Sequence, residues 1–125
     1  MSHWSAVKTQ FKDLGSLKAA AAELGLNWLD GTTANVGYAT LDKLVGTLNG
    51  QQRGHTIGVR KESDGTYSLH TDWMFGVDEI VGREYARLKQ IYGVRTVEAK
   101  AKARGLTTKR IQVGGKINLE IGGLR

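Results

Sequence analysis

Glycine is the residue that most constrains how this chain can fold, because it occupies 17 of the 125 positions, about twice its usual share of about 7%. Glycine interrupts helices and favours turns, so we expect short elements joined by tight turns. Proline and cysteine are both absent. Without cysteine the chain forms no disulfide, no thiolate metal site and no thiol nucleophile. The length suits a single domain over residues 1–125.

The first half of the chain predicts a strand, a helix and a hairpin. Residues 2–10 alternate loosely and read as a strand. A helix is expected over 11–24, with Asp13 as its N-cap and Gly25 as its stop. Residues 55–61 and 66–73 alternate between apolar and polar side chains, and Ser63-Asp64-Gly65 lies between them. This pattern is typical of a β-hairpin.

The segment 33–48 fits two structures. Leu41, Leu44, Val45 and Leu48 have the i, i+3, i+4, i+7 spacing of a helix face. The glycines and threonines of the segment favour extended structure instead. We favour strand.

The second half predicts two helices and a closing hairpin. Apolar residues from Val77 to Tyr92 form a wide helical stripe, and Gly93 is expected to end this helix. A short helix with Thr96 as N-cap follows over 96–104, and strands at 107–113 and 116–121 flank Gly114-Gly115. This order of elements predicts an α+β fold, an antiparallel sheet with helices packed on one face.

Several short motifs, in their order, resemble a known family. They are Met1-Ser2-His3-Trp4, Lys8-Thr9-Gln10, Leu24-Gly25, Asn27-Trp28, His55-Thr56-Ile57-Gly58-Val59 and Tyr67-Ser68-Leu69-His70-Thr71-Asp72. The family consists of small uncharacterised proteins encoded in cyanobacterial genomes, algal plastids and cyanophages. The resemblance implies a fold and a host group, and it also favours strand over 33–48. It implies no activity, and the chain departs from the family after Trp73-Met74-Phe75 and at its C-terminus.

The most informative functional feature is the uneven charge. Residues 83–110 hold nine basic side chains against two acidic ones, so this segment accounts for the whole net charge of +6. Clustered basic groups attract phosphates, and arginine can bind them bidentately. The candidate anion-binding residues are Arg83, Arg87, Arg95, Lys100, Lys102, Arg104, Lys109 and Arg110. We expect the last five of these to be mostly exposed, and a merely solvated helix face is the alternative.

Two aromatic residues are candidates for stacking against a base. Trp4 and Trp28 could serve this purpose, whereas Tyr67, Tyr85 and Trp73 suit the core better. His3, His55 and His70, with Asp72, could in principle hold a metal. Scattered histidines are more often surface or hydrogen-bonded residues, so we predict no metal site and no cofactor.

The sequence favours a binding protein over an enzyme. It contains neither a GxxxxGK[ST] phosphate loop nor a GxSxG nucleophile elbow. We therefore predict a non-enzymatic basic protein that binds RNA, DNA or a nucleotide. The alternative is a protein–protein adaptor or host-directed modulator that uses a sheet edge and exposed tryptophans. We expect a cytoplasmic monomer or homodimer, with no signal peptide and no membrane segment.

Overall fold

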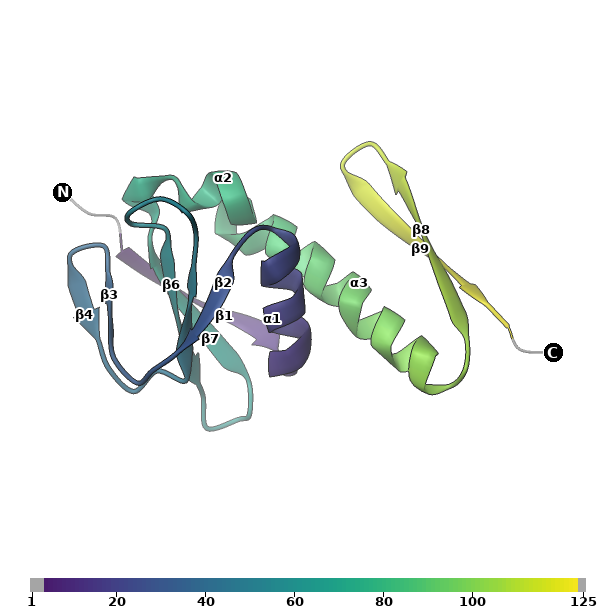
Figure 1. The fold of residues 1–125 in the computed structure, drawn as a ribbon, viewed down its shortest axis with the longest axis horizontal. Helices are drawn as coiled ribbons and strands as arrows, with labels where there is room; N and C mark the ends of the chain where they lie inside the picture. Colours follow the sequence, from purple (N-terminus) through teal and green to yellow (C-terminus); the bar gives the residue numbers. More distant parts are fainter. Residues whose placement is uncertain (1–3, 124–125) are drawn as a thin grey trace.

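The computed structural model describes residues 4–123. One strand and one helix are followed by six short strands, a run of helices and a closing pair of strands (Figure 1), and the three-residue 3₁₀ helices are called η. In chain order they are β1 (Trp4–Phe11), α1 (Leu14–Glu23), β2 (Asn27–Asp30), β3 (Ala34–Val36), β4 (Ala39–Leu41), β5 (Gly46–Asn49), β6 (Thr56–Lys61), β7 (Tyr67–Asp72), η1 (Trp73–Phe75), α2 (Val77–Val81), η2 (Arg83–Tyr85), α3 (Ala86–Ala103), β8 (Thr107–Val113) and β9 (Lys116–Gly122).

Five strands form one antiparallel sheet in the order β1-β7-β6-β5-β2. One face of this sheet packs against the helices, which confirms the predicted α+β class. The side chains buried between the two layers come from both: Phe11, Leu17, Ala20, Ala21, Leu26, Leu48, Ile57, Val59, Leu69, Val77, Val81, Tyr85, Leu88 and Ile91. The 63–65 turn is also confirmed, since Gly65 has a φ of 86° between β6 and β7.

Helix α1 has the N-cap and the glycine stop that its sequence predicts, but it begins at Leu14 and not at residue 11, because Phe11 is the last residue of β1. The Asp13 side chain accepts a hydrogen bond from the Gly15 N–H at 3.0 Å, which caps the first turn. Gly25, with a φ of 88°, follows the last turn.

The opposite face of the sheet is covered by the β3–β4 hairpin. Val36, Leu41 and Leu44 form a small second core there. Gly58 of β6 points toward this hairpin, since a Cβ at this position would lie 3.1 Å from Leu41 Cδ1. The prediction of strand over helix in segment 33–48 is therefore confirmed, because this segment forms β3, β4 and most of β5.

The helical region after β7 differs from its prediction. The expected helix over 77–92 breaks at Gly82, where φ is 80°, and Glu84 and Tyr85 also have positive φ values. Gly93 does not end a helix. It lies inside α3, which continues into the region predicted to form a separate second helix. Here Thr96 is no N-cap, and its hydroxyl donates to the carbonyl of Tyr92 at 2.8 Å.

Burial explains where the helix breaks. The break at Gly82 places Tyr85 wholly inside the core, with its ring centroid 4.8 Å from that of Trp73. A glycine in a helix interior costs only about 1 kcal/mol. A single helix buries both Ile91 and Val94, on either side of Gly93, and this burial outweighs that cost.

Strands β8 and β9 form the predicted closing hairpin but a sheet of their own (Figure 1). This two-stranded ribbon lies beyond α3, on the side away from the five-stranded sheet. Helix α3 thus lies between the main core and the hairpin. Among residues 4–123 no helix is both long enough and apolar enough to cross a membrane.

Candidate anion-binding surface

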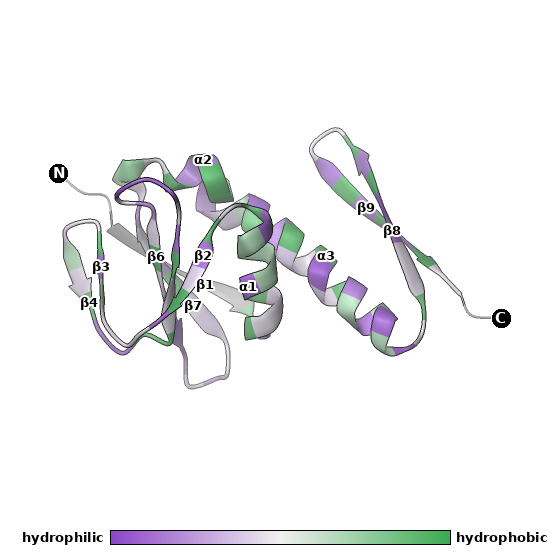
Figure 2. Cartoon of the chain, in the orientation of Figure 1, coloured by the Kyte–Doolittle hydropathy of each residue, from purple (hydrophilic) through white to green (hydrophobic). Residues whose placement is uncertain are grey.

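Helix α3 presents basic side chains along its solvent-exposed face. Lys89 and Lys100 are 11 residues apart, which is about three helical turns, and Arg104 follows one turn later. All three side chains are exposed. Lys102 on the flank of the helix and Lys109 early in β8 are exposed as well. Hydrophilic segments accordingly recur along α3 toward its C-terminal end (Figure 2).

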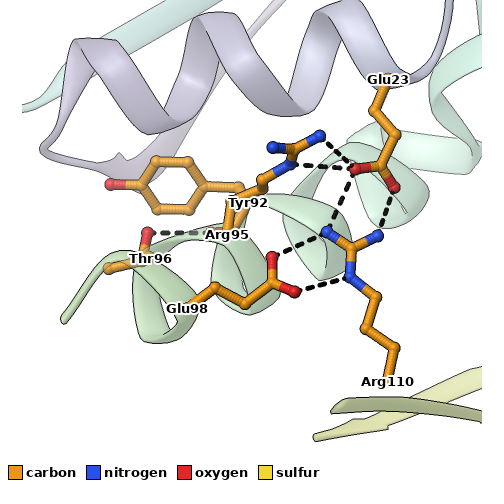
Figure 3. A network of polar contacts seen from close by, with 6 residues as sticks. All are labelled: Glu23, Tyr92, Arg95, Thr96, Glu98 and Arg110. Carbon is orange, nitrogen blue, oxygen red and sulfur yellow. Dashed lines mark hydrogen bonds and ion pairs between the residues drawn. The ribbon is translucent and has the colours of Figure 1, made fainter. Parts of the chain in front are cut away.

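Two of the predicted arginines are engaged in an ion-pair network (Figure 3). Arg110 binds Glu98 through two hydrogen bonds of 2.8 and 2.9 Å, and it binds Glu23 through contacts of 2.8 and 3.2 Å. Arg95 binds the same Glu23 carboxylate at 2.8 Å. The expectation that Arg110 is mostly exposed is wrong, because its side chain is only 30% exposed.

The network also shifts the protonation equilibria of its members. Hydrogen bonds from Arg110 hold the pKa of Glu23 below its usual value, and Arg95 adds to this effect. The pKa of Glu98 is lowered by the same arginine. Hydrogen bonds that Arg110 donates to Glu98 and then to Glu23 raise the pKa of Arg110. Glu23, Glu98 and Arg110 therefore stay charged near neutral pH, and the carboxylates occupy the arginines that they bind.

The remaining predicted arginines near the start of α3 have different environments. Arg87 donates to the backbone carbonyls of Glu79 and Ile80 at 2.7 and 2.9 Å, so it satisfies the last turn of α2. Arg83 is exposed in η2. Because α3 has 18 residues, Arg83 lies at the opposite end of a helix about 27 Å long from the basic cluster at its C-terminus.

The structure thus divides the eight predicted residues into separate groups. We call Lys100, Lys102, Arg104 and Lys109 the α3 basic cluster. All four are exposed, and within residues 4–123 they make no ion pair. Arg95 and Arg110 hold the fold together, Arg87 caps α2, and Arg83 lies apart.

Two shallow grooves flank the C-terminal half of α3 and meet at Asp13 and Ala99. One, of about 580 Å³, is lined by Lys12 and Lys100, and the other, of about 650 Å³, by Arg95 and Lys102. Lys12 is the basic residue that sequence reasoning missed. The hydroxyl of Tyr92 accepts hydrogen bonds from the Lys12 and Asp13 N–H groups, which fixes this segment beside α3. No local sequence signal links positions 80 residues apart.

Trp28 is partly buried and packs against the main core. A Cβ at Gly46 would collide with the Cζ2 and Cη2 atoms of its indole ring, and the Lys18 ammonium lies over the ring, 4.5 Å from its centroid. The indole N–H donates to Asp30 at 2.7 Å. Stacking of a base on Trp28 stays a prediction. Trp4 begins β1, and its side chain lies outside the described part of the structure.

Ser68, His70 and Glu62 are linked by hydrogen bonds in the sheet. The Ser68 hydroxyl donates to Glu62 at 3.0 Å, and its oxygen lies 2.9 Å from His70 Nε2. Burial, and secondarily the charge of Arg60, lowers the pKa of His70. Ser68 is only 4% exposed and His70 only 6%. A substrate has no access to this hydroxyl, so the arrangement stabilises the sheet. Of the other histidines, His55 lies in the β5–β6 loop, and His3 lies outside the described residues.

Sequence reasoning also missed a cavity of about 810 Å³ at the far end of the main sheet. Tyr38, Arg53 and Phe75 are among its lining residues. A faint signal was present, because Gly50 and Gly54 enclose Arg53 in a polar loop. No periodicity brings this loop together with Tyr38.

No protein-family model, curated protein or solved structure matches this chain significantly. The resemblance to the cyanobacterial, plastid and phage family stays a prediction.

Proposed function

We propose that this protein is a non-enzymatic nucleic-acid-binding protein that contacts phosphates of RNA or DNA through the α3 basic cluster. Lys12 and Lys89 extend the same positive surface. Recognition would be independent of sequence, because lysine and arginine contacts to phosphates carry no base information. Such a partner fits the cytoplasmic location that the sequence favours.

One observation carries the proposal: the two acidic side chains that contact the arginines beside the α3 basic cluster are bound to those arginines and not to the cluster. Glu23 and Glu98 both bind Arg110, and Glu23 also binds Arg95. The four side chains of the α3 basic cluster make no ion pair within residues 4–123, although Asp13 lines both grooves and Glu120 is the cross-strand partner of Lys109. Exposed basic groups that are in excess attract a polyanion and release its condensed counterions, which is the main source of non-specific nucleic-acid affinity.

A protein partner is the second candidate function. Leu29 is exposed on β2, which is an edge strand of the main sheet, and Val113 and Ile121 are exposed on the separate hairpin. Edge strands can pair with a strand of another protein or of a second copy. This observation supports the adaptor or host-modulator alternative, with the α3 basic cluster then facing an acidic partner.

A simple purification separates the two candidates. The protein is purified without nuclease at low salt, and its absorbance ratio at 260 and 280 nm is compared before and after a high-salt wash. Nucleic-acid binding predicts a raised ratio that falls after the wash. The Lys100→Gln/Lys102→Gln/Arg104→Gln variant should elute without bound nucleic acid even at low salt. A wild-type protein that carries no nucleic acid and binds none when RNA and DNA are added would favour the adaptor.

A further inference from the structure

The cavity at the far end of the main sheet is separate from the α3 basic cluster. It lies between the turn of the β3–β4 hairpin, the loop 50–55 between β5 and β6, and η1. In Figure 1 this region is at the left, whereas α3 and the β8–β9 hairpin are at the right. Its volume of about 810 Å³ is in the range of small-molecule sites, which is about 300–1,000 Å³.

Two aromatic rings form part of its wall. Tyr38 is 78% exposed, which is unusual for a large aromatic side chain in a short hairpin turn. Its ring centroid is 5.8 Å from that of Phe75, with the two planes tilted by 58°. Because Tyr38 is so exposed, much of its ring is accessible beside Phe75. A planar ring can stack on such an accessible ring.

The walls are held in place by close backbone contacts. Gly54, with a φ of 87°, lies so close to Phe75 that a Cβ would collide with its ring. The loop is closed by hydrogen bonds from the Gly50 N–H to the His55 carbonyl at 2.7 Å and from the His55 N–H to the Gln52 carbonyl at 3.1 Å. The cavity is therefore formed before any ligand arrives.

One buried carboxyl connects the two aromatic walls. Asp72 accepts the Met74 N–H at 3.0 Å and so caps η1, which carries Phe75. The same carboxyl lies directly against Gly37, the neighbour of Tyr38, where φ is 61°. A side chain at Gly37 would therefore push the two walls apart.

The polar groups at the cavity include the donors of Arg53 and Asn35. Arg53 is exposed and makes no ion pair or side-chain hydrogen bond within residues 4–123. The Asn35 oxygen accepts from Thr40 at 3.0 Å, which leaves its NH₂ group to donate. No aspartate or glutamate is among the described lining residues. This set of groups suits a ligand with hydrogen-bond acceptors and a negative charge.

From this geometry we infer that the cavity binds a single nucleotide, with its base stacked on Tyr38 beside Phe75 and its phosphate held by Arg53. Asn35 donates to the edge of the base. The inference goes beyond the proposed function, because it needs no residue of the α3 basic cluster. The nucleotide is either a free nucleoside monophosphate or the phosphorylated 5′ end of a single strand, and both present the same base and phosphate.

Calorimetric titration tests this inference with AMP, GMP, CMP, UMP and a 5′-phosphorylated trinucleotide. At least one of these probes should bind. Tyr38→Ala should weaken binding about tenfold, as expected for loss of one stacked base, whereas Tyr38→Phe should retain it. Arg53→Gln should weaken the binding of the nucleotide. It should leave unchanged the binding of the matching nucleoside, which is already weaker in the wild type. Val113→Ala and Lys61→Gln, two exposed positions remote from the cavity, are the matched controls.

Each outcome bears on the inference. Tighter binding of a free monophosphate assigns the site to free nucleotides, and tighter binding of the trinucleotide assigns it to strand ends. The inference is overturned if no probe binds at millimolar concentration, if Tyr38→Ala binds like wild type, or if inorganic phosphate alone binds as tightly as the nucleotides. Binding that is lost in the Lys100→Gln/Lys102→Gln/Arg104→Gln variant would place the nucleotide at α3 and also overturn it. Intact nucleotide binding in that variant, with loss of polynucleotide binding, supports both proposals separately.

Discussion

Arg110 in β8 and Glu23 in α1 form an ion pair of 2.8 Å across 87 positions of the chain. This pair attaches the β8–β9 hairpin to the first helix, and Glu98 in α3 completes the attachment. Gln90 adds a second attachment by accepting from the Ile117 N–H at 3.0 Å. A two-stranded hairpin is marginally stable alone, so these contacts keep it against α3.

Arg110→Gln should therefore loosen the hairpin selectively. Loss of its ion pairs should lower the free energy of unfolding by only about 1 kcal/mol, since the groups are partly exposed. Amide exchange should speed up in residues 107–122 and stay unchanged in β6 and β7. Lys109→Gln, an exposed neighbour outside the network, is the control. Equal protection of the hairpin in both variants would contradict a structural role for Arg110.

Acid should have the same effect as this substitution. Glu23 and Glu98 have lowered pKa values in the folded protein, chiefly because Arg110 hydrogen-bonds to both. Their contribution is complete above the ordinary glutamate value of 4.5 and is lost as pH falls below it through the folded pKa values. Hairpin amide exchange is measured from pH 6 to pH 3 and corrected for the pH dependence of the intrinsic exchange rate, and the resulting protection factors should fall below about pH 4.5. In Arg110→Gln this loss of hairpin protection on acidification should be much smaller. A loss as large as that of the wild type would assign the acid effect to other groups.

The glycines at 93 and 82 should respond in opposite ways to alanine. Nothing lies within 4 Å of a Cβ at Gly93, so Gly93→Ala should stabilise α3 by up to about 1 kcal/mol. At Gly82, φ is 80° and a Cβ would lie 2.7 Å from the Arg87 nitrogen. Gly82→Ala should destabilise by more than about 1 kcal/mol. Urea denaturation measures both, and a destabilising Gly93→Ala would mean that the helix does break there.

Leu88 is the test of the main core. Its side chain is fully buried between α3 and the sheet. Leu88→Ala should lower the free energy of unfolding by about 2–5 kcal/mol. Lys89→Ala, at the adjacent exposed position, should change it by less than about 0.5 kcal/mol. Similar losses of unfolding free energy in the two variants would contradict an orientation of α3 in which Leu88 faces the core and Lys89 faces solvent.

Local signals predict the strands and turns of this protein better than its helices. Gly65 and Gly114 allow the β6–β7 and β8–β9 hairpins to be predicted from the sequence, because a positive φ in a tight turn favours glycine. The break after α2 escapes such reasoning, since it depends on burying Tyr85 against Trp73, a contact between distant positions. The sequence indicates a basic segment, but not which of its arginines bind carboxylates. That choice depends on Glu23, which the fold brings to Arg95 and Arg110 from α1.

The most direct test of the proposed function is a salt titration of nucleic-acid binding. For wild type, the logarithm of the affinity should fall linearly with the logarithm of salt concentration, by about 0.7 per phosphate contact on single strands and about 0.9 on duplex DNA. The Lys100→Gln/Lys102→Gln/Arg104→Gln variant should show a slope shallower by up to about 2 units on single strands. The control removes three exposed lysines elsewhere, Lys43, Lys61 and Lys116, and should keep the wild-type slope. Equal slopes in both variants, or no binding to RNA or DNA at low salt, would contradict nucleic-acid binding by the α3 basic cluster.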